Sequence, residues 1–142
     1  MSHDTHLIES EIASETVFKG ALLEVRKDRV LLPDGRESLR EYIVHPGAVV
    51  VLAFLDNGNL LFERQFRYPL RRVFLELPAR KIDTGEPILD SARRELREET
   101  GLRAQTRALL GLLDVAPGMS SQRGHVFLAT GVIEGPPERE PE

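Results

Sequence analysis

The sequence predicts an α+β domain built from many short strands and one amphipathic helix. Three observations lead to this prediction. Turn signals rich in Gly, Pro, Asp and Asn divide most of the chain into strand-like segments. Residues 86–100 combine helix signals at both ends with apolar side chains at helical spacing. A length of 142 residues suits one domain with a real core, but not two such domains.

The N-terminal third is expected to form antiparallel strands. Residues 1–12 are predicted to be a flexible tail. The strand candidates of this part of the chain lie within residues 13–45. They are Thr16–Phe18, Ala21–Leu32 and Ser38–Val44. Pro33-Asp34-Gly35 is a typical turn between the last two of these.

Residues 46–134 are expected to hold the core, and together with residues 13–45 they form a single predicted domain over 13–134. Val49–Leu55 is a continuous apolar run, as expected for a buried strand. Asp56-Asn57-Gly58 predicts a tight hairpin turn, from which Leu60–Gln65 returns. The remaining strand candidates are Val73–Leu77, Thr106–Asp114 and His125–Ile133.

The helix predicted over residues 86–100 has signals at both ends. Thr84 and Gly85 are cap candidates, and Pro87 suits the first turn. Gly101 is typical of the residue just past the last turn of a helix. The apolar side chains fall within an arc of about 100° on a helical wheel. They are Ile88, Leu89, Ala92 and Leu96.

Three carboxylates of this helix lie on an unexpected side. With Ile88 at zero, Glu95 lies at about −20°, Glu99 at about +20° and Glu98 at about −80°. Two of them overlap the apolar arc, whereas a run of charges usually forms a solvated face. Like charges one turn apart also destabilise a helix. A divalent cation with oxygen ligands turns that repulsion into attraction, so the pattern favours a metal site over a solvated face.

The residues from Arg94 to Leu102, with Glu86 upstream, resemble the signature of the Nudix hydrolases. That signature runs Gly, five residues, Glu, seven residues, Arg-Glu-apolar-any-Glu-Glu-any-Gly-apolar. Every defined position fits except the first, where Arg80 replaces the glycine. The resemblance implies a Nudix-type α/β/α sandwich with a mixed central sheet. Residues 135–142 are acidic and rich in proline and are expected to be disordered, so the C-terminal helix of that fold is missing from the predicted elements.

Other segments resemble the ADP-ribose pyrophosphatase branch of this family. They are Glu41–Val51, Arg64–Pro69, Leu75–Ala79 and Pro117-Gly118. The resemblance implies metal-dependent cleavage of ADP-ribose to AMP and ribose 5-phosphate. GDP-mannose or another nucleotide sugar is an alternative substrate. Two further alternatives are a non-hydrolytic Nudix module that binds a nucleotide sugar as a sensor, and a purely structural domain.

The same resemblance implies a cofactor, Mg²⁺ or Mn²⁺, and its ligands. The expected ligands are the carboxylates of Glu95 and Glu99 and the carbonyl of Ala79. Glu98 is expected to be a further ligand or to orient the attacking water. Arg94 is expected to pair with an acid of the motif and to fix its rotamer.

Substrate contacts are expected from residues outside the helix. Arg67 is the candidate for a phosphate contact, because a guanidinium offers a bidentate fork to phosphate oxygens. Arg40 and Glu41 match a pair that reaches the adenine or ribose in this branch, often across a dimer interface, although polar residues of an exposed strand are equally compatible with the sequence. Glu140 is the candidate for the general base. The resemblance also implies a homodimer.

Composition narrows the remaining classes of function. The formal net charge of −4 argues against a nucleic-acid surface, so the expected partner is a small-molecule nucleotide sugar. No stretch approaches the length of a membrane span, and the first residues lack an apolar secretory segment. The absence of cysteine is compatible with a reducing compartment, and a cytoplasmic location is expected.

Overall fold

The computed structural model describes residues 4–133, without the side chain of Thr106. Within this range the chain divides into two compact units. The first comprises the described part of Met1–His45 together with Val115–Gln122. The second comprises Pro46–Asp114 and the described part of Arg123–Glu142. The prediction of disorder for residues 135–142 lies outside the described residues.

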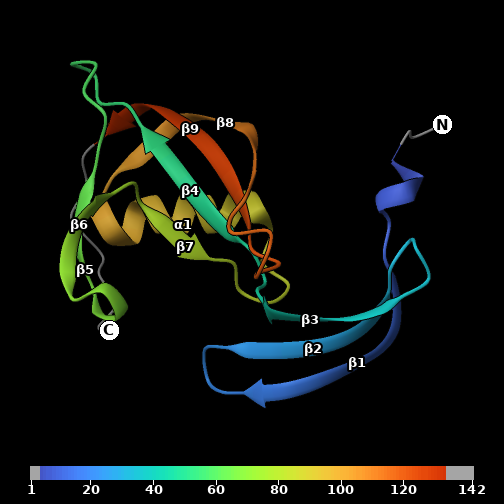
Figure 1. Cartoon of the computed structure of the whole chain (residues 1–142). Coiled ribbons are helices and arrows are strands. Elements are labelled where there is room, and N and C mark those ends of the chain that lie inside the picture. Colours follow the sequence, from blue (N-terminus) through green and yellow to red (C-terminus); the bar gives the residue numbers. More distant parts are fainter. Residues whose placement is uncertain (1–3, 134–142) are drawn as a thin grey trace. The chain divides into compact units, whose positions relative to one another are not determined.

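The first unit is a three-stranded antiparallel sheet in the order β1-β2-β3, coloured blue to cyan in Figure 1. A 3₁₀ turn, η1 (Thr5–Leu7), precedes the sheet. The strands are β1 (Ser10–Lys19), β2 (Glu24–Leu31) and β3 (Glu37–Val44). The predicted antiparallel N-terminal strands are thereby confirmed.

Strand β1 is much longer than the predicted Thr16–Phe18 and begins inside the segment predicted as a tail. The full length of β1 could not be predicted from the sequence. All ten residues of the strand are exposed, so its apolar and polar residues do not alternate between a buried and a solvated face. Strand β1 is held in an extended conformation by backbone pairing with β2, from Ser10 opposite Leu31 to Lys19 opposite Glu24. A mostly polar segment can therefore be a strand when a neighbouring strand satisfies its backbone groups.

A buried carboxylate links the three strands of this sheet. Asp28 of β2 is 6% exposed. Its two oxygens accept hydrogen bonds from the hydroxyl of Ser14 on β1 at 2.6 Å and from that of Tyr42 on β3 at 2.9 Å. The same contact raises the pKa of the Tyr42 hydroxyl, because the hydroxyl donates to a carboxylate. Each strand thus contributes one group to a satisfied polar network.

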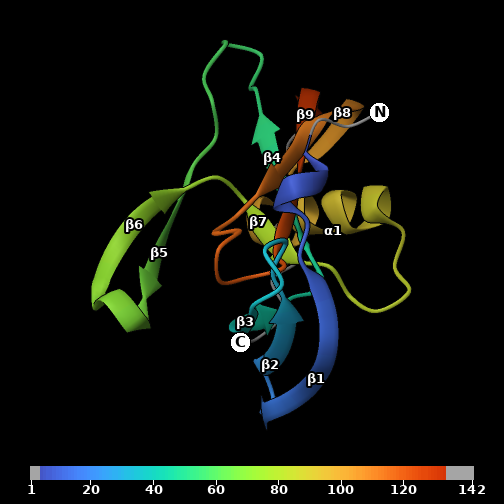
Figure 2. The ribbon, with the colours of Figure 1, turned by 45° about the vertical axis from the view of Figure 1, so that its right-hand side comes forward.

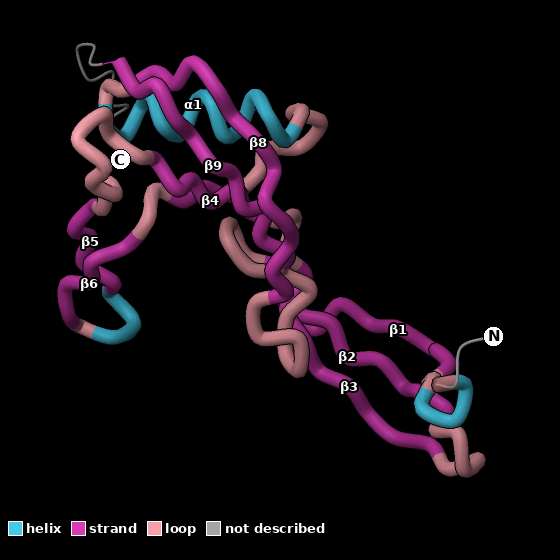
Figure 3. The backbone as a smooth tube through the Cα atoms, turned by 90° about the horizontal axis from the view of Figure 1, so that it is seen from above, coloured by secondary structure: helices cyan, strands magenta, loops and turns pink. Residues whose placement is uncertain are grey.

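The second unit contains a four-stranded mixed sheet in the order β7-β4-β9-β8. Its strands are β4 (Ala48–Ala53), β7 (Ala79–Lys81), β8 (Arg103–Asp114) and β9 (Arg123–Ile133). Strands β4 and β9 are parallel, and the other neighbours are antiparallel. Helix α1 (Ile88–Thr100) contacts β4, β7 and β8 along one side of this sheet (Figures 1 and 3).

The core of the second unit lies between α1 and the sheet. Leu96 of α1 and Val49 and Val51 of β4 are among the largest side chains that are almost completely buried. Burying an aliphatic side chain of this size stabilises the fold by about 1.5–3 kcal/mol. The other members of this cluster come from the same helix, from the strands and from the segments next to them. They are Ala53, Ile82, Ala92, Leu102, Ala104, Phe127, Ala129 and Val132.

A separate antiparallel pair, β5 (Glu63–Arg67) and β6 (Arg72–Glu76), is joined by the 3₁₀ turn η2 (Tyr68–Leu70), and Figure 2 shows this hairpin most clearly. The prediction that Leu60–Gln65 returns along the preceding strand was wrong. The Asp56-Asn57-Gly58 turn is present, but it leads only to an isolated bridge between Phe54 and Leu60. Strand β9 pairs with one edge of β4, and β7 pairs with the other edge over Ala48–Val50. Beyond β7 the returning segment reaches this edge only at its start, where the N–H of Leu61 donates to the carbonyl of Ala53.

Helix α1 is shorter at its start than predicted, because Pro87 and not Thr84 or Gly85 occupies the N-cap position. Its end is as predicted: Gly101 is left-handed, with φ 71°, and its N–H donates to the carbonyl of Arg97. Within residues 4–133 it is the one α-helix, which fits the predicted α+β class with one helical layer. Helix α1 is also too short and too polar to cross a bilayer, and the described residues contain no other candidate span.

Candidate functional site

The three acids predicted as a metal site lie on α1, and two of them are buried. Glu95 is 3% exposed and Glu98 is 6% exposed, beside the core residues Ala92 and Leu96. Glu99 lies at the exposed edge of the same helix. The helical wheel placed Glu95 and Glu99 within the apolar arc and Glu98 on its shoulder. Glu95 is buried as placed, whereas Glu99 is exposed and Glu98 is buried. We call Glu95, Glu98 and Glu99 the acid cluster.

Glu95 has an environment that disfavours its charge. No residue in the described range 4–133 forms a hydrogen bond or ion pair with it. Burial is the main cause that raises the pKa of its carboxyl to about 7. The charges of Glu99, Glu63 and Glu98 raise it further, while Arg80 acts in the opposite direction. An ionised Glu95 is favourable at this position only beside a compensating positive charge.

Glu63 is an acidic neighbour that the sequence analysis missed. It lies at the start of β5, far from the helix in sequence, and its charge raises the pKa of Glu95. No local pattern around Glu63 distinguishes it from an ordinary strand residue. Only the folding of the β5–β6 hairpin brings it close to α1, so its proximity depends on tertiary structure.

Glu98 is neutralised within the protein by Arg80. The Arg80 guanidinium donates a hydrogen bond to Glu98, and the side chains are 26% and 8% exposed. The Arg97 guanidinium lies 3.9 Å from the other oxygen of Glu98. Arg80 is the residue that replaces the first glycine of the motif, so the departure from the signature provides a counter-ion for one acid of the cluster. The substitution was visible in the sequence, but its partner was not.

The acid cluster fits a divalent cation in ligand type and in charge. All its side-chain donors are carboxylate oxygens, which Mg²⁺ and Mn²⁺ prefer. The fit is incomplete in geometry: among the described residues, no three His, Asp, Glu or Cys side chains already converge as a metal site. A cation shared by these acids therefore requires their side chains to rotate, and Glu98 to leave Arg80.

Ala79, whose carbonyl was predicted as a ligand, lies at the start of β7. It faces Val50 of β4 in the sheet register, and α1 contacts this strand. The short strand is thus next to the helix that carries the acid cluster. The role of the Ala79 carbonyl stays a prediction.

Arg94 forms the expected pair with an acid of the motif. Its guanidinium lies 2.7 Å from Glu86 and also bonds Asp83, and the hydroxyl of Ser91 donates to Glu86. The hydrogen bonds from Arg94 lower the pKa of Glu86 and of Asp83. These contacts tie the loop before α1 to the middle of the helix. The expected effect of this pair on catalysis stays a prediction.

The guanidinium of Arg67, predicted to contact phosphate, is engaged by Glu76. Its Nε donates to both carboxylate oxygens, at 3.0 and 3.1 Å, across the β5–β6 pair. This contact lowers the pKa of Glu76. A contact between Arg67 and phosphate therefore requires the guanidinium to share or leave Glu76, and it stays a prediction.

The remaining predicted residues lie away from the acid cluster in sequence. Arg40 and Glu41 belong to β3 of the first unit. Arg40 donates from Nε to Glu9 at 2.9 Å, and Glu41 lies 3.9 Å from the ammonium of Lys27. Their contact with a substrate stays a prediction. Glu140, the predicted base, lies outside the described residues.

The chain matches two family models in succession. The model of the nucleoside diphosphate sugar hydrolase N-terminal domain matches residues 11–43. The NUDIX domain model matches residues 44–142. The second match includes α1 and the acid cluster.

Proteins of known sequence agree with these matches. The ADP-ribose pyrophosphatase of Mycobacterium tuberculosis is 46% identical over 129 residues, which cover 89% of this chain and 62% of that protein. The ADP-ribose pyrophosphatase of Bacillus subtilis is 42% identical, with coverages of 87% and 66%. The methanol dehydrogenase activator of Bacillus methanolicus is 36% identical, with coverages of 87% and 67%. The chain thus spans about two thirds of the length of these relatives.

The fold is also similar to that of a solved structure. The crystal structure of an ADP compounds hydrolase superposes with a TM-score of 0.81 and 26% sequence identity, covering 94% of this chain and 74% of that chain. The sequence signature, the mixed sheet with its acidic helix and the NUDIX match over more than half of the residues agree with one another. The chain belongs to the Nudix family.

Proposed function

We propose that this chain hydrolyses the diphosphate bond of a nucleoside diphosphate sugar, with ADP-ribose as substrate. Water oxygen forms a new bond to one phosphorus, and the bond from that phosphorus to the bridging oxygen breaks. The bridging oxygen leaves on the other phosphate, so the products are AMP and ribose 5-phosphate. The names of the relatives from M. tuberculosis and B. subtilis support this choice of substrate.

The observation that carries the proposal is the buried Glu95, which lies in a cluster of acids and has no hydrogen-bond or ion-pair partner within residues 4–133. A carboxylate in this environment is costly unless a positive charge compensates it. We propose that Glu95 and Glu99 hold Mg²⁺ or Mn²⁺, with Glu98 and the Ala79 carbonyl as further oxygen donors. When bound, such an ion neutralises diphosphate charge and lowers the pKa of a coordinated water.

The protein's own residues prepare this site in the proposal. Arg94 positions the start of α1 through its bonds to Glu86 and Asp83. The core contacts of Ala92 and Leu96 hold the face of α1 that carries Glu95 against the sheet. Arg67 is proposed to reach the substrate phosphates, and Arg40 with Glu41 the nucleoside. Glu140 is proposed as the base that accepts the proton of the water.

A direct test incubates the purified chain with ADP-ribose and Mg²⁺ and follows the two monophosphates by phosphorus NMR. Turnover is expected for the unmodified chain and is expected to be lost in Glu99→Gln. Asp56→Asn, in the exposed turn after β4, is the matched control and should retain activity. Activity that survives in Glu99→Gln would contradict the proposed role of the acid cluster. GDP-mannose in a parallel reaction separates ADP-ribose from the alternative nucleotide-sugar substrates.

A sensor that binds a nucleotide sugar without hydrolysis is the second candidate function. The ion pair between Arg80 and Glu98 favours it, because it withdraws one acid from the proposed metal site. The relative from B. methanolicus is named as an activator of another enzyme. Tight binding of ADP-ribose without any release of AMP would support the sensor and contradict the hydrolase.

We also propose a homodimer and a cytoplasmic location. Among the described residues, no strand pairs with the outer edge of β1. The strand also has exposed apolar side chains, including Ile12, Val17 and Phe18, which suit a second copy of the chain. Light scattering coupled to size exclusion tests the assembly. A monomer at micromolar concentration would contradict the dimer. Microscopy of a fluorescent fusion in the native host tests the location, and signal confined to the cell envelope would contradict it.

A further inference from the structure

Arg80 brings a positive charge from the sheet into the acid cluster. In the sheet register Arg80 of β7 lies opposite Val49 of β4, and opposite residues of paired strands share one face of a sheet. Val49 is completely buried in the core between α1 and the sheet. Arg80 is therefore on the face that α1 covers, where its guanidinium donates to Glu98 and its charge also acts on Glu95.

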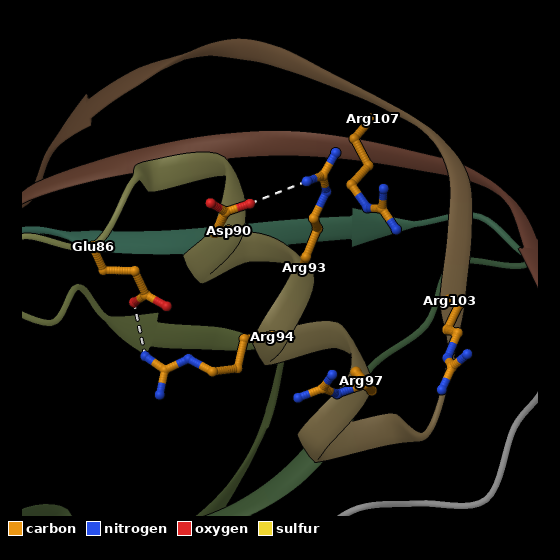
Figure 4. A pocket seen from close by; sticks show the side chains of 7 residues that line it. All are labelled: Glu86, Asp90, Arg93, Arg94, Arg97, Arg103 and Arg107. Carbon is orange, nitrogen blue, oxygen red and sulfur yellow. Dashed lines mark hydrogen bonds and ion pairs between the residues drawn. The ribbon is translucent and has the colours of Figure 1, made fainter.

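Two arginines of α1 are bonded to acids outside the cluster. Figure 4 shows the pocket between α1 and β8, in which Arg93 bonds Asp90 at 3.0 Å and Arg94 bonds Glu86 at 2.7 Å. These contacts hold the first turns of the helix and the loop before it. Arg80 differs from both, because its hydrogen bond goes to an acid of the cluster itself.

A change of partner at Glu98 would leave Arg80 without its hydrogen bond. The side chains of Arg80 and Glu98 are 26% and 8% exposed, so water can replace only part of the interaction. Arg97, 3.9 Å from Glu98, would remain beside this acid. The other acid near Arg80 is Asp83, at 4.0 Å, which already bonds Arg94. A partly buried cation that loses its counter-ion is costly unless another anion takes its place.

The diphosphate of a nucleotide sugar is the anion that suits this place. A diphosphate and the carboxylates of the acid cluster would share the same divalent cation, so they would lie close together. A guanidinium also presents two parallel N–H groups that match two phosphate oxygens. The glycine that the signature has at position 80 carries no side chain and could bind neither Glu98 nor a phosphate.

We propose that Arg80 couples metal binding to substrate binding. In the metal-free protein Arg80 neutralises Glu98. When Glu98 turns to a divalent cation, Arg80 is released and donates to the diphosphate of the substrate. Each ligand then binds more tightly in the presence of the other, since coupling between two sites is reciprocal. This inference rests on the proposed function and assigns a further substrate-binding residue to the same site.

A thermodynamic cycle tests the proposal. The ligand is the α,β-methylene analogue of ADP-ribose, in which a CH₂ group replaces the bridging oxygen, so its diphosphate cannot be hydrolysed. Calorimetry gives its affinity for the full chain in EDTA and in saturating Mg²⁺, and the ratio of the two affinities measures the coupling. Mg²⁺ also attracts the analogue directly. This attraction is common to all variants, so a difference in the ratio between variants reports the share of Arg80.

Substitutions on β7 isolate that share. Arg80→Ala is expected to bind the analogue about tenfold more weakly in Mg²⁺, because a charge-assisted hydrogen bond is lost. In EDTA its affinity should be nearly unchanged, because Glu98 holds Arg80 there. Arg80→Lys keeps the charge but not the fork and should lie between the two in Mg²⁺. Lys81→Ala removes the exposed cation next in the strand, which lies on its opposite face, and should leave both affinities unchanged.

NMR of the unmodified chain gives a second measurement that does not depend on how well the variants fold. The Nε–H signal of Arg80 should shift when Mg²⁺ is added, because the bond to Glu98 is lost. It should shift again when the analogue follows. A signal that neither addition changes would overturn the proposal.

Two results of the cycle would also overturn it. One is an equal loss of affinity in EDTA and in Mg²⁺ for Arg80→Ala, because Arg80 would then act only through its general charge. The other is an affinity in Mg²⁺ that Arg80→Ala leaves unchanged. Failure of the unmodified chain to hydrolyse ADP-ribose would contradict the proposed function but not the coupling, because the analogue is never hydrolysed. Hydrolysis together with a coupling that does not depend on Arg80 would contradict only the present inference.

Discussion

Replacement of Arg80 by alanine is expected to destabilise the metal-free protein and to strengthen its binding of Mn²⁺. Arg80 is the positive charge that the protein itself places on Glu98, and the two side chains are 26% and 8% exposed. Without Arg80, Glu98 remains buried near Glu95 with less compensation. A cation that enters the cluster then no longer competes with a guanidinium for this carboxylate.

The expected size follows from the burial of the pair. Two unit charges about 4 Å apart attract by about 4 kcal/mol at an effective dielectric constant of about 20. Breaking a fully buried pair costs about 3–5 kcal/mol. Arg80 is partly exposed, and water will replace some of its interaction, so a loss of about 2 kcal/mol in the free energy of unfolding is expected. For Mn²⁺, one fewer positive charge next to the site should tighten binding about tenfold, which corresponds to about 1.4 kcal/mol.

Two measurements are needed. Urea unfolding in EDTA gives the stability of the metal-free protein, and calorimetric titration with Mn²⁺ gives the affinity. The control is Arg36→Ala, which removes an exposed arginine that pairs with Asp34 in the first unit, and both quantities should remain unchanged. A variant at Arg80 that loses stability but binds Mn²⁺ no better, or more weakly, would refute the competition between the guanidinium and the metal.

Three other substitutions test separate parts of the structure. Glu95→Gln removes a buried acid that has no hydrogen-bond or ion-pair partner in the described part of the chain, so the metal-free protein should melt at a higher temperature and should no longer be stabilised by Mn²⁺. A lower melting temperature in EDTA would contradict this. Glu76→Gln removes the acid that bonds Arg67, whose pKa is lowered in the folded protein. The stability that Glu76 contributes is present above its unfolded pKa of 4.5 and is lost as the pH falls through the folded value, so the two proteins should differ in urea unfolding at neutral pH and converge in acid. A difference that persists in acid would show that the pair is not responsible. Leu96→Ala leaves a cavity in the core under α1 and should lower the free energy of unfolding by about 2–5 kcal/mol, whereas a loss below about 1 kcal/mol would contradict the packing described.

The parts of the fold that local sequence determines were predictable. Helix α1 and its end at Gly101 follow from periodicity and backbone preference, which involve residues within one or two turns. The position of Glu95 on the buried side followed from the same wheel. The continuous apolar run that became β4 was also clear, because a strand paired on both edges and covered by a helix needs few polar side chains.

What the sequence did not predict depends on pairing between distant segments. Arg80 and Glu98 are 18 positions apart, and Arg67 and Glu76 are 9 apart, so neither ion pair has a helical or adjacent-residue signature. Strand β1 was not predicted at its full length because all its residues are exposed and its extended conformation depends on pairing with β2. The partner of β5 was predicted wrongly because the local sequence does not show that this strand pairs with β6 and not with β4.

The central claim is that the carboxylates of α1 hold a divalent cation, and electron paramagnetic resonance of Mn²⁺ tests it most directly. The signal of free Mn²⁺ should fall as the unmodified chain is added, and it should stay unchanged when Glu95→Gln or Glu99→Gln is added at the same concentration. A free Mn²⁺ signal that the unmodified chain leaves unchanged, or that the two variants reduce equally, would contradict the claim.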